Sequence, residues 1–139
     1  MATVGKTTLK PLRWPRFWLV LWLLAVALLV VVCLIPLQGL PPLPDNSDKV
    51  EHLLGYFILS ASAVQLFSRR MLAWPAAGLV LLGIGVEFAQ GQTSYRSLDA
   101  YDALFNTFGV LLGMATALTP LRDFLLRLEA RAGGMRRRD

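Results

Sequence analysis

The sequence is poor in charge and has almost no cysteine. Charged residues make up 17% of the 139 residues, whereas about a quarter is usual in a soluble domain. The single cysteine, Cys33, excludes an internal disulfide and a multi-cysteine metal site. Hydrophobic residues reach 55% and are concentrated in long runs. This composition favours an integral membrane protein.

Four apolar runs divide the chain, and we interpret each as a membrane-spanning helix. They cover residues 17–38, 50–68, 71–90 and 103–121. The first is uncharged, can cross a hydrocarbon core of about 30 Å, and is too long for the apolar part of a signal peptide. The second and third reach the usual span of about 20 residues only by including Glu51, His52 and Glu87 near one end. We therefore predict an all-α protein built on a four-helix transmembrane bundle.

The basic residues predict how these spans are oriented. Short connections force consecutive spans to alternate in direction, so only Lys49 and Arg96 of the 14 Lys and Arg fall on the side away from the termini. The positive-inside rule then predicts a multi-pass cell-membrane protein with both termini cytoplasmic. The predicted parts are a basic N-terminus, a membrane domain and a basic tail with a short amphipathic helix, at residues 1–16, 17–121 and 122–139. Positive flanks explain the net charge of +5, so no nucleic-acid partner is expected.

Polar residues form a stripe at the outer end of the fourth run. Asp99, Asp102, Asn106, Gly109 and Gly113 are separated by three, four, three and four residues, which places them on one face of a helix. The two glycines form a GxxxG pair, which lets another backbone approach closely. The stripe is therefore expected to face protein rather than lipid.

The second and third runs carry polar residues at the same outer level. Lys49, His52, Tyr56 and Ser60 form a second stripe at helical spacing, and Asp48 lies one turn before His52. The third run contributes Glu87 and Gln90, and Arg96 lies in the connection that follows. We predict that these side chains converge in a polar pocket at the outer leaflet.

Three segments resemble, in order, the motifs of the VanZ-like family of membrane proteins. They are DKVEHLLGY at residues 48–56, EFAQ at 87–90 and RSLDAYDALFNTFGVLLG at 96–113. The resemblance covers about residues 45–115. It implies that the shared polar positions are Asp48, Lys49, His52, Tyr56, Glu87, Gln90, Arg96, Asp102, Asn106 and Gly109. The family is named for a protein associated with resistance to teicoplanin, a glycopeptide that acts at the cell surface, so the resemblance implies a cell-envelope setting.

The first functional hypothesis is a site that binds a lipid headgroup or a lipid-linked cell-envelope component. The same site could also carry out acid–base chemistry. The catalytic candidates are His52, Glu87 and Asp102, with His52 as a general base oriented by Asp48. The predicted ligand-binding residues are Asp48, Lys49, Tyr56, Gln90, Arg96, Asp99 and Asn106, and the predicted packing residues are Gly109 and Gly113. Lys49 and Arg96 suit a phosphate, although the acids outnumber these bases at the outer end. Whether the protein is an enzyme stays open.

Two alternatives assign other roles to the same residues. The polar groups could form a closed network that fixes helix packing, with Lys49 and Arg96 paired to Asp102 and Glu87. They could also relay protons or small cations, but the inner halves of the spans carry few polar residues. A metal held by His52, Glu87, Asp99 and Asp102 is also chemically possible, since carboxylates and imidazole suit several divalent ions. Because no local ligand motif such as HxxxH occurs, we predict no metal and no cofactor.

Overall fold

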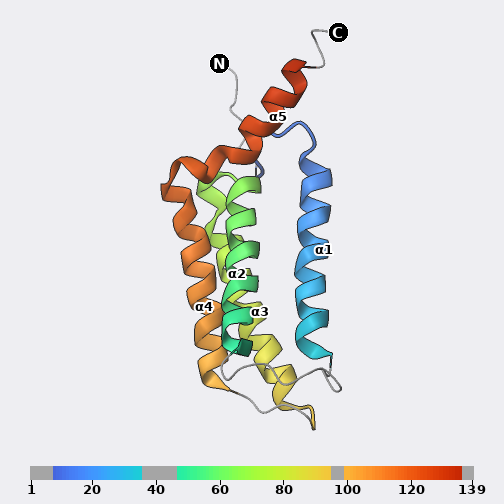
Figure 1. The fold of residues 1–139 in the computed structure, drawn as a ribbon, viewed down its shortest axis with the longest axis vertical. Coiled ribbons are helices and arrows are strands. Elements are labelled where there is room, and N and C mark those ends of the chain that lie inside the picture. Colours follow the sequence, from blue (N-terminus) through green and yellow to red (C-terminus); the bar gives the residue numbers. More distant parts are fainter. Residues whose placement is uncertain (1–7, 36–46, 95–98, 136–139) are drawn as a thin grey trace.

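The computed structural model describes residues 8–35, 47–94 and 99–135. The regular secondary structure of this part of the chain is helical. Apart from one isolated bridge between Leu9 and Phe67, it contains no β-structure. Figure 1 shows α1 (Pro15–Leu34), α2 (Ser47–Leu66), η1 (Arg69–Met71), α3 (Ala73–Gly91), α4 (Ala100–Ala115), η2 (Thr116–Leu118), η3 (Pro120–Asp123) and α5 (Phe124–Met135). Three helical segments are long and apolar enough to cross a membrane, namely Pro15–Leu34, Arg69–Gly91 and Ala100–Leu118. The predicted all-helical fold is confirmed over the described residues, and these three segments support the predicted membrane protein by their length and composition.

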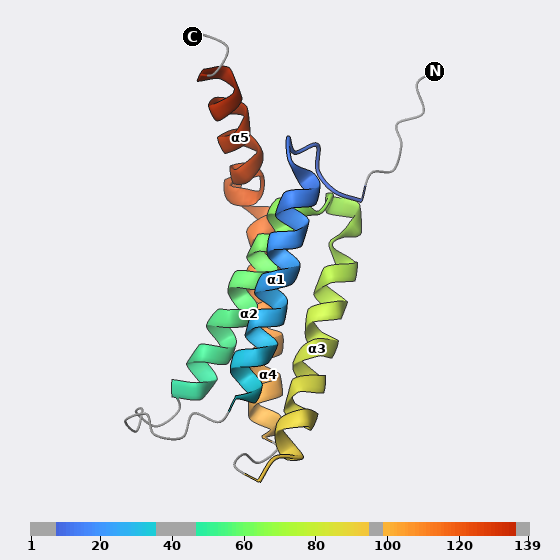
Figure 2. The same cartoon turned by 90° about the vertical axis from the view of Figure 1, so that its right-hand side faces the viewer.

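The four long helices, α1 to α4, run side by side, and each is antiparallel to the next in sequence (Figures 1 and 2). Consequently α2 and α4 begin at the same end at which α1 and α3 finish. We call this the acidic end, because it carries Glu51, Glu87, Asp99 and Asp102. The opposite end, here called the basic end, carries α5 and the residues Lys10, Arg69, Arg70 and Arg122.

Three helices begin earlier than the apolar runs predict, and α2 is one of them, since it begins at Ser47 instead of residue 50. α1 begins at Pro15 instead of residue 17, because proline fits the first turn, where its missing N–H would have no partner. α4 begins at Ala100 instead of residue 103, because the Asp99 carboxylate accepts a hydrogen bond from Tyr101 N at 2.8 Å and caps the helix. α4 continues into η2, which ends before Thr119 and Pro120 rather than at residue 121. Asp99 is therefore a cap, and not part of the helical stripe predicted from its spacing.

The closest helix pair is α2 with α4, and glycine makes it possible. A Cβ atom at Gly113 would lie 2.6 Å from Phe57 O and 2.7 Å from Ala61 N, and one at Gly109 would collide with the Leu53 carbonyl. Between these glycines, Ser60 Oγ donates a hydrogen bond of 2.7 Å to Val110 O. The polar stripe of α4 therefore faces α2, as the GxxxG pair indicates.

α1 is attached to α2 and α3 by two hydrogen bonds from side chains to backbone carbonyls. Trp22 Nε1 donates to Leu59 O of α2 at 2.9 Å, and Gln90 Nε2 of α3 donates to Cys33 O at 2.7 Å. Much of the remaining surface of α1 is apolar and exposed, as a helix in contact with lipid would be.

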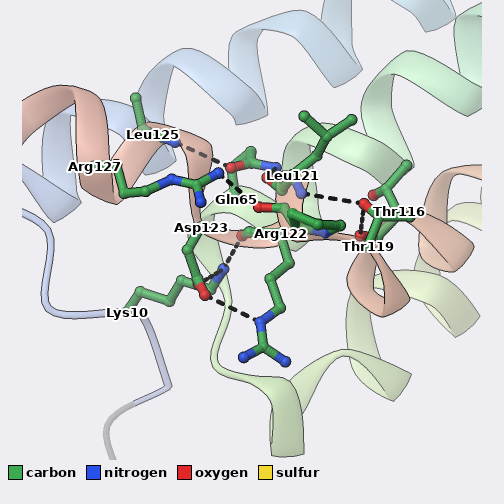
Figure 3. A network of polar contacts seen from close by, with 10 residues as sticks. Lys10, Gln65, Thr116, Thr119, Leu121, Arg122, Asp123, Leu125 and Arg127 are labelled. Carbon is green, nitrogen blue, oxygen red and sulfur yellow. Dashed lines mark hydrogen bonds and ion pairs between the residues drawn. The ribbon is translucent and has the colours of Figure 1, made fainter.

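Polar contacts close the basic end, where α5 meets the N-terminal segment (Figure 3). Lys10 Nζ lies 2.9 Å from Asp123 Oδ1 and also bonds the Arg122 carbonyl. The Gln65 amide donates to Leu121 O and accepts from Leu125 N. α5 exposes Phe124 and Leu128. This arrangement fits the amphipathic tail helix expected from the sequence.

Candidate functional site

Three ionisable side chains from three helices meet near the acidic end. The residues are His52 of α2, Glu87 of α3 and Asp102 of α4. One imidazole nitrogen and one oxygen from each carboxylate lie within 4.8 Å of one another. His52 Nδ1 lies 3.5 Å from Glu87 Oε1. The exposed fractions of these residues are only 5%, 3% and 6%. We call this group the triad.

The triad forms because of where each residue lies on its helix. His52 and Asp102 are close to the beginnings of α2 and α4, whereas Glu87 lies about one turn before the end of α3. Since α3 runs antiparallel to both, its last turns reach the level of their first turns (Figure 2). The close α2–α4 packing at Gly109 then brings Asp102 near His52.

Lys49 lies in the first turn of α2, on the side of the triad nearer the helix ends, and contacts two aspartates. Its Nζ atom is 3.1 Å from Asp99 Oδ2 and 3.3 Å from Asp102 Oδ1. The hydrogen bond from Tyr101 N, followed by that from Lys49, holds the pKa of Asp99 below its usual range. Lys49 therefore links the helix cap to the triad and partly offsets its negative charge.

A second polar layer lies one turn deeper than the triad. Tyr56 and Asn106 are 0% and 1% exposed, and their side chains lie against Gly83 of α3. Within the described residues, neither the Tyr56 hydroxyl nor the Asn106 amide has a hydrogen-bond partner. Buried polar groups are nearly always hydrogen-bonded, so these two are unusual.

Three other predicted site residues are not seen to contact the triad, because they lie apart from it or their side chains are outside the part of the chain that the structure describes. The Gln90 amide is buried and bonds the Cys33 carbonyl, so it attaches α3 to α1. Arg96 lies outside the described residues, and Asp48 is described only as part of the α2 backbone. The orientation of His52 by Asp48 and the binding of phosphate by Arg96 stay predictions.

Sequence reasoning missed two contacts that shape the site. Spacing within α2 predicts Asp48 as a partner of His52, and the structure adds a contact with Glu87 of α3 that the sequence did not predict. Gly83 was not among the predicted site residues, yet the absence of its side chain makes room for Asn106 and Tyr56. The sequence did contain a signal for this role of Gly83, because Gly83 lies four residues before Glu87 and therefore on the same face of α3.

The site can exchange protons and attract cationic or hydrogen-bonding groups. An imidazole beside a carboxylate can accept or donate a proton, and two buried carboxylates favour a positive partner. Tyr56 and Asn106 add a hydroxyl and an amide beneath them. A search of protein-family models found no match to this chain, and comparisons with curated proteins and with solved structures found no significant similarity.

Proposed function

We propose that this chain is a VanZ-like integral membrane protein that engages a lipid headgroup or lipid-linked cell-envelope component at the outer leaflet. The observation that carries the proposal is the convergence of His52, Glu87 and Asp102 from three helices. In this arrangement α1 to α4 are four spans, the acidic end faces outward, and both termini are cytoplasmic.

The packing of α2 supports its assignment as the fourth span. Its 20 residues equal the length of α1, and it packs against α4 from the Lys49–Asp102 ion pair to the Gly113 contact. Its charged residues, Asp48, Lys49 and Glu51, all lie within its first five residues at the acidic end, where headgroups and water lower the cost of charge. A helix packed in this way would lie in the membrane together with α4.

The composition of the site favours a ligand over packing alone. Interhelical hydrogen bonds in a membrane protein are worth about 0.6 kcal/mol on average, so they are a weak reason to bury three ionisable groups. Ionisable side chains within spans commonly mark binding or transfer pathways. The buried Asn106 amide, which has no hydrogen-bond partner among the described residues, is suited to bonding a ligand.

Native mass spectrometry of the purified protein tests this proposal directly. We expect the parent to retain a bound lipid or lipid-linked component, and His52→Ala and Glu87→Ala to lose it. Glu51→Gln is the matched control, because Glu51 is an exposed carboxylate beside His52 on the same turn of α2. A parent that retains no such component, or variants that keep it at the parent's level, would refute the proposal.

The structural alternative has one specific observation in its favour. Lys49 contacts both Asp99 and Asp102, as a network that fixes helix packing requires. Under this alternative the protein would carry no specific lipid, and both alanine variants would unfold earlier than the parent. Measuring thermal unfolding on the same samples separates the two functions.

A further inference from the structure

We propose that the triad is a binding site for one divalent transition-metal ion of the Zn²⁺ or Mn²⁺ type. The geometry points to this, because one imidazole and two carboxylates converge from three helices with donor atoms within 4.8 Å of one another. From the sequence we predicted no metal, because no local ligand motif such as HxxxH occurs. That argument does not extend to ligands brought together from separate helices.

The donor set identifies the class of ion. Imidazole suits ions such as Zn²⁺, and carboxylate oxygens suit ions such as Mn²⁺, whereas Mg²⁺ prefers oxygen donors and retained water. Zn²⁺ binds nitrogen and oxygen at about 2.0–2.2 Å in tetrahedral geometry, so two ligands of one ion lie about 3.4 Å apart. The His52–Glu87 distance of 3.5 Å already fits, and closing the remaining separations of the triad requires side-chain shifts of about 1 Å.

The residues around the triad fit a supporting shell. Lys49 contacts Asp102 from the outer side, while Asn106 and Tyr56 present buried polar atoms on the inner side. Metal ligands are typically oriented by such outer hydrogen-bonding groups. The Asn106 amide and the Tyr56 hydroxyl are also two further groups that could hold water or ligand oxygen beside the ion.

A bound ion would change the charge of the site. Its two positive charges would balance the Glu87 and Asp102 carboxylates, so that a site dominated by acids could accept an anionic headgroup. Three protein ligands leave a coordination position open, as in catalytic metal sites. This consequence rests on the proposed function, whereas ion binding itself is measured separately.

The sequence offers an unusually specific probe, because His52 is the only histidine. Protein labelled with ¹⁵N-histidine and purified with a tag free of histidine gives imidazole signals from this side chain alone. After treatment with EDTA, we expect Zn²⁺ to shift these signals with a stoichiometry near one, and Mn²⁺ to broaden them. Mg²⁺ at the same concentration should leave them unchanged.

Calorimetric titration of Zn²⁺ into ligand variants tests which residues bind the ion. Glu87→Gln and Asp102→Asn keep the shapes of the side chains and should each weaken Zn²⁺ binding by at least about tenfold. Glu51→Gln, which removes an exposed carboxylate from the same end, should bind Zn²⁺ like the parent. Circular dichroism confirms that each variant is folded.

The possible results separate this inference from the proposed function. A parent that binds no stoichiometric Zn²⁺ or Mn²⁺, or that loses binding equally in Glu51→Gln, overturns the metal site. Lipid retained in native mass spectrometry would then still support the headgroup site. Stoichiometric metal binding without any retained lipid would support the metal site and refute the headgroup proposal.

Discussion

At the scale of the residue, glycine decides how closely α2 and α4 approach. A side chain at Gly113 meets backbone atoms, which cannot rotate away. We therefore expect Gly113→Ala to force the helices apart and lower the free energy of unfolding by about 1–3 kcal/mol. Titration with a denaturing detergent, followed by circular dichroism, measures this change.

Gly78 provides the matched control for this prediction. It lies inside α3, and a Cβ atom there would meet nothing within 4 Å. Gly78→Ala should leave stability unchanged or raise it by up to about 1 kcal/mol through helix propensity. Equal losses at both positions would contradict the explanation based on backbone contact.

Asn106 separates a structural role from a binding role. Its amide is buried and lacks a hydrogen-bond partner among the described residues. Replacing such a group with an apolar side chain of similar size is close to neutral or stabilising. We expect Asn106→Leu to unfold within about 1 kcal/mol of the parent while losing the retained lipid. A large loss of stability would instead assign Asn106 to helix packing.

Residue spacing predicted much of the site but not its contacts. It placed Asp102, Asn106 and the two glycines on one face, because three- and four-residue steps return to the same side of a helix. It could not identify the partner of His52, since Glu87 lies on another helix and its approach depends on how α3 packs. It also placed Asp99 on the helix, whereas a carboxylate before the first turn gains more by capping.

At the scale of the element, α5 is held to the rest of the chain by ionisable contacts. Lys10 bonds Asp123 just before α5, and Glu129 within α5 accepts from Arg13 N at 2.6 Å and Trp18 Nε1 at 2.7 Å. These contacts connect the tail to the segment that precedes α1. The attachment of α5 should therefore depend on pH.

Asp123 gives this pH dependence a sign. Its pKa is lowered chiefly by the hydrogen bond from Lys10 and further by Arg122. A lowered pKa contributes stability that is complete above the usual aspartate value of about 3.9 and is lost as pH falls through the folded value. We expect the advantage in thermal stability of the parent over Asp123→Asn to stay constant from pH 6 to about 4 and to shrink as pH falls further toward 2. A difference that stays constant over the whole range would contradict the assignment.

The helices themselves were predictable, and their ends were less so. Long apolar runs predicted all four long helices, because a chain segment in contact with lipid must satisfy its backbone hydrogen bonds internally, as a helix does. The limits shifted by two or three residues where local chemistry decides, namely at Pro15, Asp99 and Thr119. Hydrophobicity is a property of a whole run and does not locate a cap.

At the scale of the whole molecule, the all-helical fold is confirmed and three candidate spans support a membrane protein, while four spans and cytoplasmic termini stay predictions. The open question concerns α2, whose polar residues leave it less apolar than the three candidate spans. Those residues are the ones that build the site. A span that supplies a polar face to a site would therefore be less apolar than its neighbours.

Cysteine labelling tests the arrangement of the spans. Glu51, Arg70 and Gln92 are exposed and lie near the ends of α2 and α3, and Cys33→Ala removes the single buried native thiol. In this background we expect a membrane-impermeant maleimide to label Glu51→Cys and Gln92→Cys in intact cells, and Arg70→Cys only after permeabilisation. Labelling of Glu51→Cys and Arg70→Cys from the same side would mean that α2 does not cross the membrane.

The attachment of α1 has a consequence for protein engineering. α1 supplies no triad residue and receives its bond from Gln90 through a backbone carbonyl, which every amino acid provides. Its one specific donor to α2 is the Trp22 indole. A foreign apolar helix that keeps a tryptophan at this position could thus be grafted in its place, and the chemistry of the other three helices would be transplantable as a unit.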